Sequence, residues 1–346
     1  MPYGNDASVF VEDIAGDLGA PSGAKTWWLS PDVDIPAHTG QAVQGSNDVQ
    51  IRVHSHEEPI VDEKIVAEVY VGAPGFVLSP TTGTKRIDQG NLRFRPPNLA
   101  GTEPVANEAG GTTSFAWTPS ANSADVDGPG HRCLIVRAFP ESVTPPSSPF
   151  DVPNEAHEAQ HNLEILTTTT AKAKMFQGGA GTPGDPRKID EDTGLWWERF
   201  STLAAKKRGR HFVVWAFDPE PNGAIVDAVR GALKGQGFRG FASEPPGEVT
   251  LEPVKGRGSQ IDPGALLRRS SPVKLEGLGR GLFNRKRLLA AAQLQLGPRT
   301  LSSLIMRFDH SGIRKRTGVV LHGVQWNEQG EPEGGMTVVA LAPTDP

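Results

Sequence analysis

Residues 157–161 read His-Glu-Ala-Gln-His, which is a literal H-E-x-x-H motif. On a helix this spacing puts two imidazoles on one face, where they bind Zn²⁺ while the glutamate acts as a general base. The flanks differ from those of a zincin helix, because Asp-Val-Pro-Asn precedes the motif and a strand-forming run follows it at 163–167. We therefore expect a polar turn leading into a strand, and a zinc-dependent hydrolase using His157, Glu158 and His161 is the alternative function.

Two other groups of residues have types and spacing that could do chemistry. Residues 54–58 (His-Ser-His-Glu-Glu) put two histidines on one face of a strand, which is compatible with metal binding but also typical of an exposed strand end. Cys133 follows His131 by two residues but begins a continuous apolar run, so we expect a buried thiol and not a nucleophile. This single cysteine excludes an intramolecular disulfide and a multi-cysteine zinc site. We expect no catalytic residue, no cofactor and no resident metal.

The charge is distributed unevenly along the 346-residue chain, although the formal net charge is only −5. Residues 1–170 contain 9 Lys and Arg against 22 Asp and Glu, whereas residues 171–346 contain 26 against 18. An acidic half and a basic half attract each other within one molecule or between copies, and the alternative is that the basic segment 268–316 binds a nucleic acid or another polyanion. The candidate basic surface comprises Arg268, Arg269, Arg285, Lys286, Arg287, Arg314, Lys315 and Arg316.

The first half has the pattern of a β-sandwich. Apolar residues alternate at 49–54 and 65–71, a continuous apolar run occupies 133–136, and residues 161–170 favour a closing strand. Stretches rich in Pro, Gly and Asn separate these segments. We predict an immunoglobulin-like sandwich over 25–172, preceded by an N-terminal arm at 1–24.

The second half, 173–346, is predicted to be a divergent β-rich domain with one short helix. Residues 212–217 form an apolar strand, and Asn222 is a plausible N-cap for a helix at about 223–234. Further strands are expected at 248–254, 288–296, 301–308, 318–324 and 336–341, although the second of these also suits a helix. The fold class is therefore mainly all-β, with tandem sandwiches joined through a Gly- and Pro-rich segment at 178–192.

Five segments of the first half together have a recognisable pattern. They are Trp-Trp-Leu-Ser-Pro-Asp-Val at 27–33, the alternating strand 49–53, Glu-Val-Tyr at 68–70, the pair 117–119 and 131–134, and Ala-Gln-His-Asn at 159–162. In these segments the first half resembles the bacterial immunoglobulin-like modules of the CARDB and related adhesion-type families. The resemblance covers about 25–170, and it implies a sandwich fold and a role as a binding or assembly module without implying an activity. No family motif is recognised in the second half.

Taken together, these patterns favour a non-catalytic structural or interaction protein. No apolar run approaches the roughly 18 residues of a membrane span, and residues 1–19 have acidic groups where a signal peptide would be basic. We expect a protein that is cytoplasmic or is released by a route other than Sec. Its expected partners are copies of itself or another assembly protein.

Overall fold

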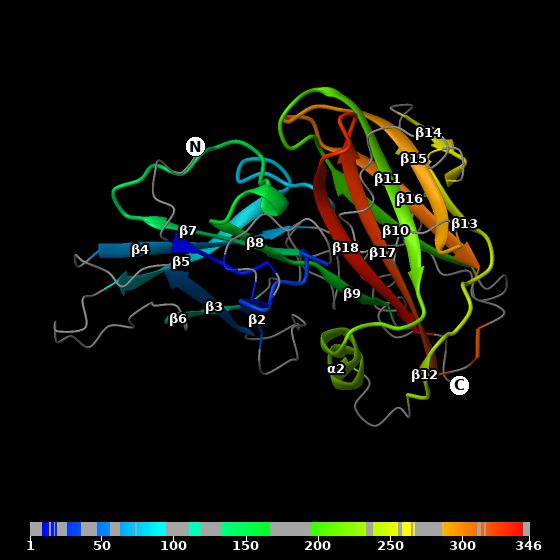
Figure 1. Cartoon of the computed structure of the whole chain (residues 1–346), viewed down its shortest axis with the longest axis horizontal. Helices are drawn as coiled ribbons and strands as arrows, with labels where there is room; N and C mark the ends of the chain where they lie inside the picture. The colour runs from blue at the N-terminus through cyan, green and yellow to red at the C-terminus, as the bar shows by residue number, and fades with distance from the viewer. Residues whose placement is uncertain are drawn as a thin grey trace.

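The protein is described by a computed structural model that consists mainly of β-strands. The structure describes residues 9–13, 15, 16, 18, 26–35, 47–55, 63–72, 75–94, 111–118, 133–166, 195–232, 238–254, 258–263, 266, 286–309, 313, 314 and 316–341. Two groups of sheets lie side by side (Figure 1). None of the helices in these ranges is long and apolar enough to cross a membrane.

The first sandwich is built from two antiparallel four-stranded sheets. In one sheet β3 (Asn47–Ser55) pairs with β1 (Val9–Phe10), β2 (Val33–Asp34) and β6 (Gly111–Trp117). The other sheet has the order β5 (Thr84–Phe94), β4 (Glu63–Gly72), β7 (Cys133–Pro140) and β8 (Glu158–His161). Val49, Ile51 and Val53 of β3 meet Ile65, Val69 and Val71 of β4 in the core between the sheets. The alternating residues of the sequence therefore face this core.

The second sandwich packs a seven-stranded sheet on a three-stranded one. The larger sheet has the order β14 (Gly258–Ile261), β15 (Leu288–Leu296), β11 (Gly209–Asp218), β17 (Thr317–Asn327), β18 (Pro332–Leu341) and β9 (Leu163–Leu166), with β12 (Gly240–Phe241) beside β17. The smaller sheet has the order β10 (Leu195–Thr202), β16 (Ser302–Asp309) and β13 (Val249–Pro253). The mainly β fold with one short helix is thus as predicted, and residues 288–296 form a strand.

The seven-stranded sheet is covered on both faces, which explains why its central strands are continuously apolar. Along β11, Trp215 faces the core shared with the three-stranded sheet, whereas Val214 and Ala216 face a second core that contains Trp27 and Trp28 of the first half. Helix α2 (Gly223–Ala232) covers a third part of the sheet. Figure 1 shows this helix beside the ends of β9 and β12.

Helix α2 begins where the sequence predicted. Asn222 is its N-cap, because the side-chain oxygen Oδ1 of Asn222 accepts a hydrogen bond from the backbone N–H of Ile225 at 3.1 Å. The helix is described to Ala232, and residues 233 and 234 of the predicted span lie outside the described residues, as does the segment 178–192.

The chain passes from the first sandwich into the second earlier than the boundary expected near residue 172. His161 still pairs with Leu134 in the first sandwich, whereas Leu163 pairs in parallel with Thr337 of β18. Asn162 lies between them, and its Nδ2 donates to Gly75 O at 2.7 Å and to Gly335 O at 2.9 Å. The predicted closing strand is therefore divided between two sheets.

Within the N-terminal arm expected at 1–24, the described residues 9–11 belong to the first sandwich. Val9, Phe10 and Val11 are at most 1% exposed, and the first two pair with Ser55 and His54 of β3. The apolar stretch at 9–11 is too short for its periodicity to predict a core strand. It becomes part of the sheet because β1 pairs with β3, which is formed by residues farther along the chain.

Trp28 gives the clearest test of the packing between the sandwiches. A Cβ built at Gly335 would lie 1.9 Å from Cε3 of Trp28, so Gly335→Ala must displace a rigid indole. We expect this change to lower the free energy of unfolding by about 3 kcal/mol, at the upper end of the usual cost of overpacking a core. Urea denaturation measures this loss. Gly223→Ala is the matched control, because nothing lies within 4 Å of the added Cβ; equal stability of the two variants would show that Trp28 does not occupy this place.

Candidate functional site: a polar pocket between the sandwiches

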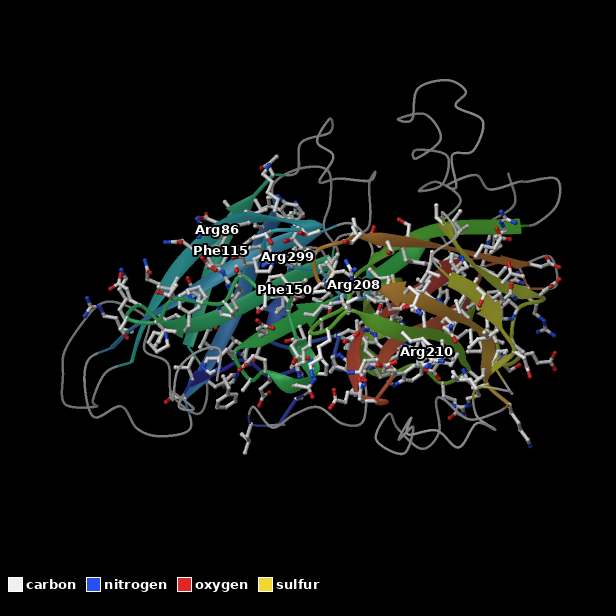
Figure 2. The ribbon with its side chains drawn as sticks, turned by 90° about the horizontal axis from the view of Figure 1, so that it is seen from above. Arg86, Phe115, Phe150, Arg208, Arg210 and Arg299 are labelled. Carbon is white, nitrogen blue, oxygen red and sulfur yellow. The ribbon has the colours of Figure 1, made fainter. Side chains whose placement is uncertain are left out.

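A pocket of about 710 Å³ lies where the two sandwiches meet. This volume falls in the range of small-molecule sites, although the lining here is largely polar. Figure 2 shows Arg299, Phe150 and Arg208 in the region where the two sets of strands come together. The first sandwich contributes Ser79, Thr81, Thr82, Pro146, Ser147, Ser148, Pro149, Asp151, Glu155 and Glu158, and the second contributes Ala205, Lys206, Pro298 and Arg299.

An ion pair crosses the pocket. The carboxylate of Asp151 lies 2.7 Å from Nζ of Lys206, and it also accepts a hydrogen bond from Nδ2 of Asn154 at 2.8 Å. Burial raises the pKa of Asp151 by more than Lys206 lowers it. Glu158 stabilises this arrangement, because its Oε2 accepts a hydrogen bond from the backbone N–H of Asp151 at 2.7 Å. Three carboxylates and two cations therefore share the pocket, which suits a polar or zwitterionic group.

A buried network lies close to this ion pair. Glu333 interacts electrostatically with both Asp151 and Lys206. Its Oε2 lies 3.2 Å from Nε2 of His211 and accepts a hydrogen bond from Nε2 of Gln325 at 2.8 Å. Burial alone would lower the pKa of His211, but the nearby Glu333 outweighs it and raises that pKa above its ordinary value.

The H-E-x-x-H residues lie in a turn and a strand, not on a helix. The backbone O of His157 accepts from Ala138 N, whereas His161 pairs with Leu134, so the two histidines span four residues of β7, or about 13 Å. Nδ1 of His157 lies 3.0 Å from Glu155 Oε1. Desolvation lowers the pKa of the buried His161. This geometry does not bring the two imidazoles to one ligand position.

The candidate nucleophile Cys133 is enclosed by the protein. Cys133 is fully buried, which raises its pKa to about 12, and its Sγ accepts a hydrogen bond from Nε2 of Gln160 at 3.1 Å. A thiol with this pKa is protonated at neutral pH and is a poor nucleophile.

An Asp-His-Thr chain lies within the seven-stranded sheet, and Trp28 of the first half joins it. Nε2 of His322 lies 3.1 Å from Asp218 Oδ2, and Nδ1 of His322 lies 2.8 Å from Thr337 Oγ1. Thr337 in turn accepts a hydrogen bond from Nε1 of Trp28 at 2.8 Å. His322 is 1% exposed and Thr337 is 0% exposed, so the imidazole and the hydroxyl of this chain are buried.

Four members of the candidate basic surface are described, and they lie at one end of the seven-stranded sheet. Lys286 and Arg287 precede β15, and Arg314 and Arg316 precede β17; both strands begin where the antiparallel β11 ends. Arg268, Arg269, Arg285 and Lys315 lie outside the described residues. The structure adds Arg239, because its backbone N–H donates to Arg316 O at 2.9 Å.

Sequence analysis did not identify the pocket. Asp151, Lys206 and Arg299 come from three loops far apart in the chain, and none of these residues forms part of a local motif. Only the tertiary contact between the sandwiches brings them together.

Comparison with known proteins gives distant likenesses to solved structures. No protein-family model matches the chain, and no curated protein matches it. The collagen adhesin from S. aureus is similar over 87% of this chain and 88% of its own, with 8% identity and a TM-score of 0.21. The N-terminal domain of the Streptococcus gordonii adhesin Sgo0707 is similar over 86% and 60%, with 8% identity and a TM-score of 0.20, and the calcium binding domain CBD12 of CALX1.1 over 86% and 76%, with 10% identity and a TM-score of 0.17. The chain is thus weakly similar to bacterial adhesin β-sandwich domains, and these scores support no statement about function.

The His211–Glu333 contact predicts a pH dependence of stability. Because the folded protein raises the pKa of His211 above 6.5, the contribution is fully present below pH 6.5 and is lost as the pH rises through the raised value. We expect the free energy of unfolding of the wild type to fall over this window, and that of His211→Gln to lack this part of the decrease. Urea denaturation at several pH values measures the difference, since one pKa unit is worth about 1.4 kcal/mol.

Glu333→Gln is the matched control for this prediction, because it removes the charge that raises the pKa of His211 while keeping a similar shape. It should abolish the same part of the pH dependence. Parallel profiles for the wild type and both variants would contradict the assignment to His211.

Proposed function

We propose that the protein is a non-catalytic interaction protein that associates head to tail, with the basic end of the second sandwich meeting the acidic first sandwich of another copy. The basic end is defined by Arg239, Arg314 and Arg316, with Lys286 and Arg287 nearby. Histidine and cysteine side chains are common catalytic groups. Those among the described residues contact other groups inside the protein, which supports a non-catalytic role indirectly.

The observation that carries the proposal is the convergence of three exposed arginines. The backbone N–H of Thr317 donates to Arg314 O at 3.1 Å, so Arg314 and Arg316 lie in one turn. Arg239 lies on the segment beside this turn, because its backbone N–H donates to Arg316 O at 2.9 Å. Among the described residues, no side-chain ion pair is formed by any of these arginines. Their charges are therefore available to an acidic partner.

The backbone at Arg316 supports the same interpretation. Its φ is 63°, in the left-handed region where glycine is preferred and other residues are strained. Glycine at this position would relieve the strain but would remove a cation from the basic end. An arginine held in such a conformation indicates a use for its side chain.

The partner surface is expected on the first half, where acidic residues exceed basic ones by 22 to 9 over positions 1–170. Asp48 is exposed and Asp34 is half-buried on the neighbouring strands β3 and β2, where Asp34 pairs with Gln50. Attraction between such surfaces is long-ranged and sensitive to salt. A copy that carries both surfaces forms a head-to-tail contact, which closes into a ring or continues as a filament.

Light scattering at two salt concentrations tests the association. We expect a mass larger than the monomer at about 0.1 M salt and a smaller mass at about 1 M, because the screening length falls from about 10 Å to about 3 Å. The double variant Arg314→Glu/Arg316→Glu should weaken the association at least tenfold. Lys207→Glu/Arg210→Glu makes the same change of charge at the opposite end of β11, and it should leave the association unchanged.

A mixing experiment tests the direction of the contact. Asp34→Lys/Asp48→Lys should also fail to associate alone, and mixing it with Arg314→Glu/Arg316→Glu should restore complexes. A wild type that is monomeric at both salt concentrations would refute self-association. Retention of that monomer on heparin, lost in Arg314→Glu/Arg316→Glu, would favour polyanion binding instead.

A further inference from the structure

Three metal-ligating side chains meet in the first sandwich, outside the pocket and the basic end. Glu12 follows β1, Asp32 precedes β2, and His54 lies in β3, which pairs with both of those strands. One ligand atom of each residue lies within 4.8 Å of the other two. The sheet therefore gathers a carboxylate, a second carboxylate and an imidazole from segments about 20 residues apart.

The three residues are held in place by buried contacts. Asp32 is 3% exposed and His54 is 5% exposed, and Glu12 is half-buried. Asp32 Oδ2 accepts the backbone N–H of Glu12 at 2.7 Å and lies 2.8 Å from Nε2 of His54. The imidazole stacks on Phe10 at 5.0 Å between ring centres. The backbone and ring positions are thus fixed by packing on two sides.

The cluster carries an unbalanced charge. This observation is independent of the distances between its ligand atoms. Two carboxylates and one imidazole carry net negative charge even when the imidazole is protonated. Within the described ranges, neither Glu12 nor Asp32 forms an ion pair with a lysine or an arginine. Asp32 is buried, whereas Glu12 is half-buried and its Oε2 accepts the backbone N–H of Gly16 at 3.1 Å. A bound cation would balance the negative charge that the imidazole leaves uncompensated.

We propose that Glu12, Asp32 and His54 bind one divalent transition-metal ion of the Zn²⁺ class. An imidazole nitrogen with two carboxylate oxygens is a donor set suited to Zn²⁺, with bonds of about 2.0–2.2 Å, whereas Ca²⁺ prefers oxygen ligands alone. Zn²⁺ takes the place of the proton on Nε2 of His54, so binding releases that proton to solvent. Asp32 then contacts the metal in place of the ring nitrogen.

The ion would fasten the N-terminal strand to the sandwich. β1 has only two residues, and two such residues alone form a weak attachment. Glu12 lies immediately after Val11, whose N–H is bonded to Ala156 O at 2.9 Å, so a metal bond at Glu12 secures the end of this short strand. The role is structural, and it departs from the expectation that the chain has no resident metal.

The experiment measures zinc bound to the purified full-length chain. The protein is stripped with a chelator, titrated with Zn²⁺ in a calorimeter and, in parallel, dialysed against Zn²⁺ for elemental analysis. We expect one zinc per chain, and at least tenfold weaker binding in Asp32→Asn and in His54→Gln. Glu12→Gln is a milder variant on a half-buried residue, and circular dichroism of all three verifies that the fold is retained.

Two further arms keep the result decisive. His157→Gln alters the H-E-x-x-H motif and should bind zinc as the wild type does, and Zn²⁺ should raise the melting temperature of both proteins but not of Asp32→Asn. Loss of zinc in His157→Gln alone would place the metal at the other motif and overturn the proposal. Failure of the wild type to bind zinc, unchanged binding in Asp32→Asn and His54→Gln, or binding of Ca²⁺ in preference to Zn²⁺ would overturn it as well.

Discussion

The arrangement of the two sandwiches depends on the packing of Trp28 against Gly335, a residue that has no side chain. The indole lies over Gly335 so closely that no Cβ fits, and its Nε1 donates to Thr337. Trp27 packs on Trp28 edge to face, with ring centres 4.6 Å apart. Two large aromatic side chains of the first half thus complete a core of the second. Burial of this kind is worth several kcal/mol for two such residues.

Polar groups next to this core form hydrogen-bonded networks with one another inside the protein. Asp218, His322 and Thr337 have their partners inside the protein, and so do Glu68 and Arg137 in the first sandwich, where Arg137 Nε donates to Glu68 Oε2 at 2.6 Å. A buried charge is tolerated only when such partners are present. These residues therefore stabilise one packing arrangement of the sandwiches.

Much of the fold follows from the sequence, because residues 49–54 and 65–71 alternate and 212–217 are apolar on both faces. β5 was missed, since Ile87 and Leu92 are its main apolar residues and an edge strand needs only one buried face. β9 was assigned to the wrong sheet, because periodicity identifies a strand but not its neighbour. The proposed metal site combines His54, which the sequence did single out, with Glu12 and Asp32, which no local pattern connects to it.

The parallel pairing of β9 with β18 links the two halves in a way that a simple tandem arrangement would not. Residues 163–166 belong to the seven-stranded sheet, whose other strands lie beyond residue 208. This sheet is therefore incomplete without a segment of the first half. Such a contact joins distant parts of the chain, and pairing of this kind is associated with slower folding. The acidic and basic surfaces are then held at one relative orientation. In the proposed association, this fixed orientation would give a weak, salt-sensitive contact between copies a defined geometry, which is what a head-to-tail assembly requires.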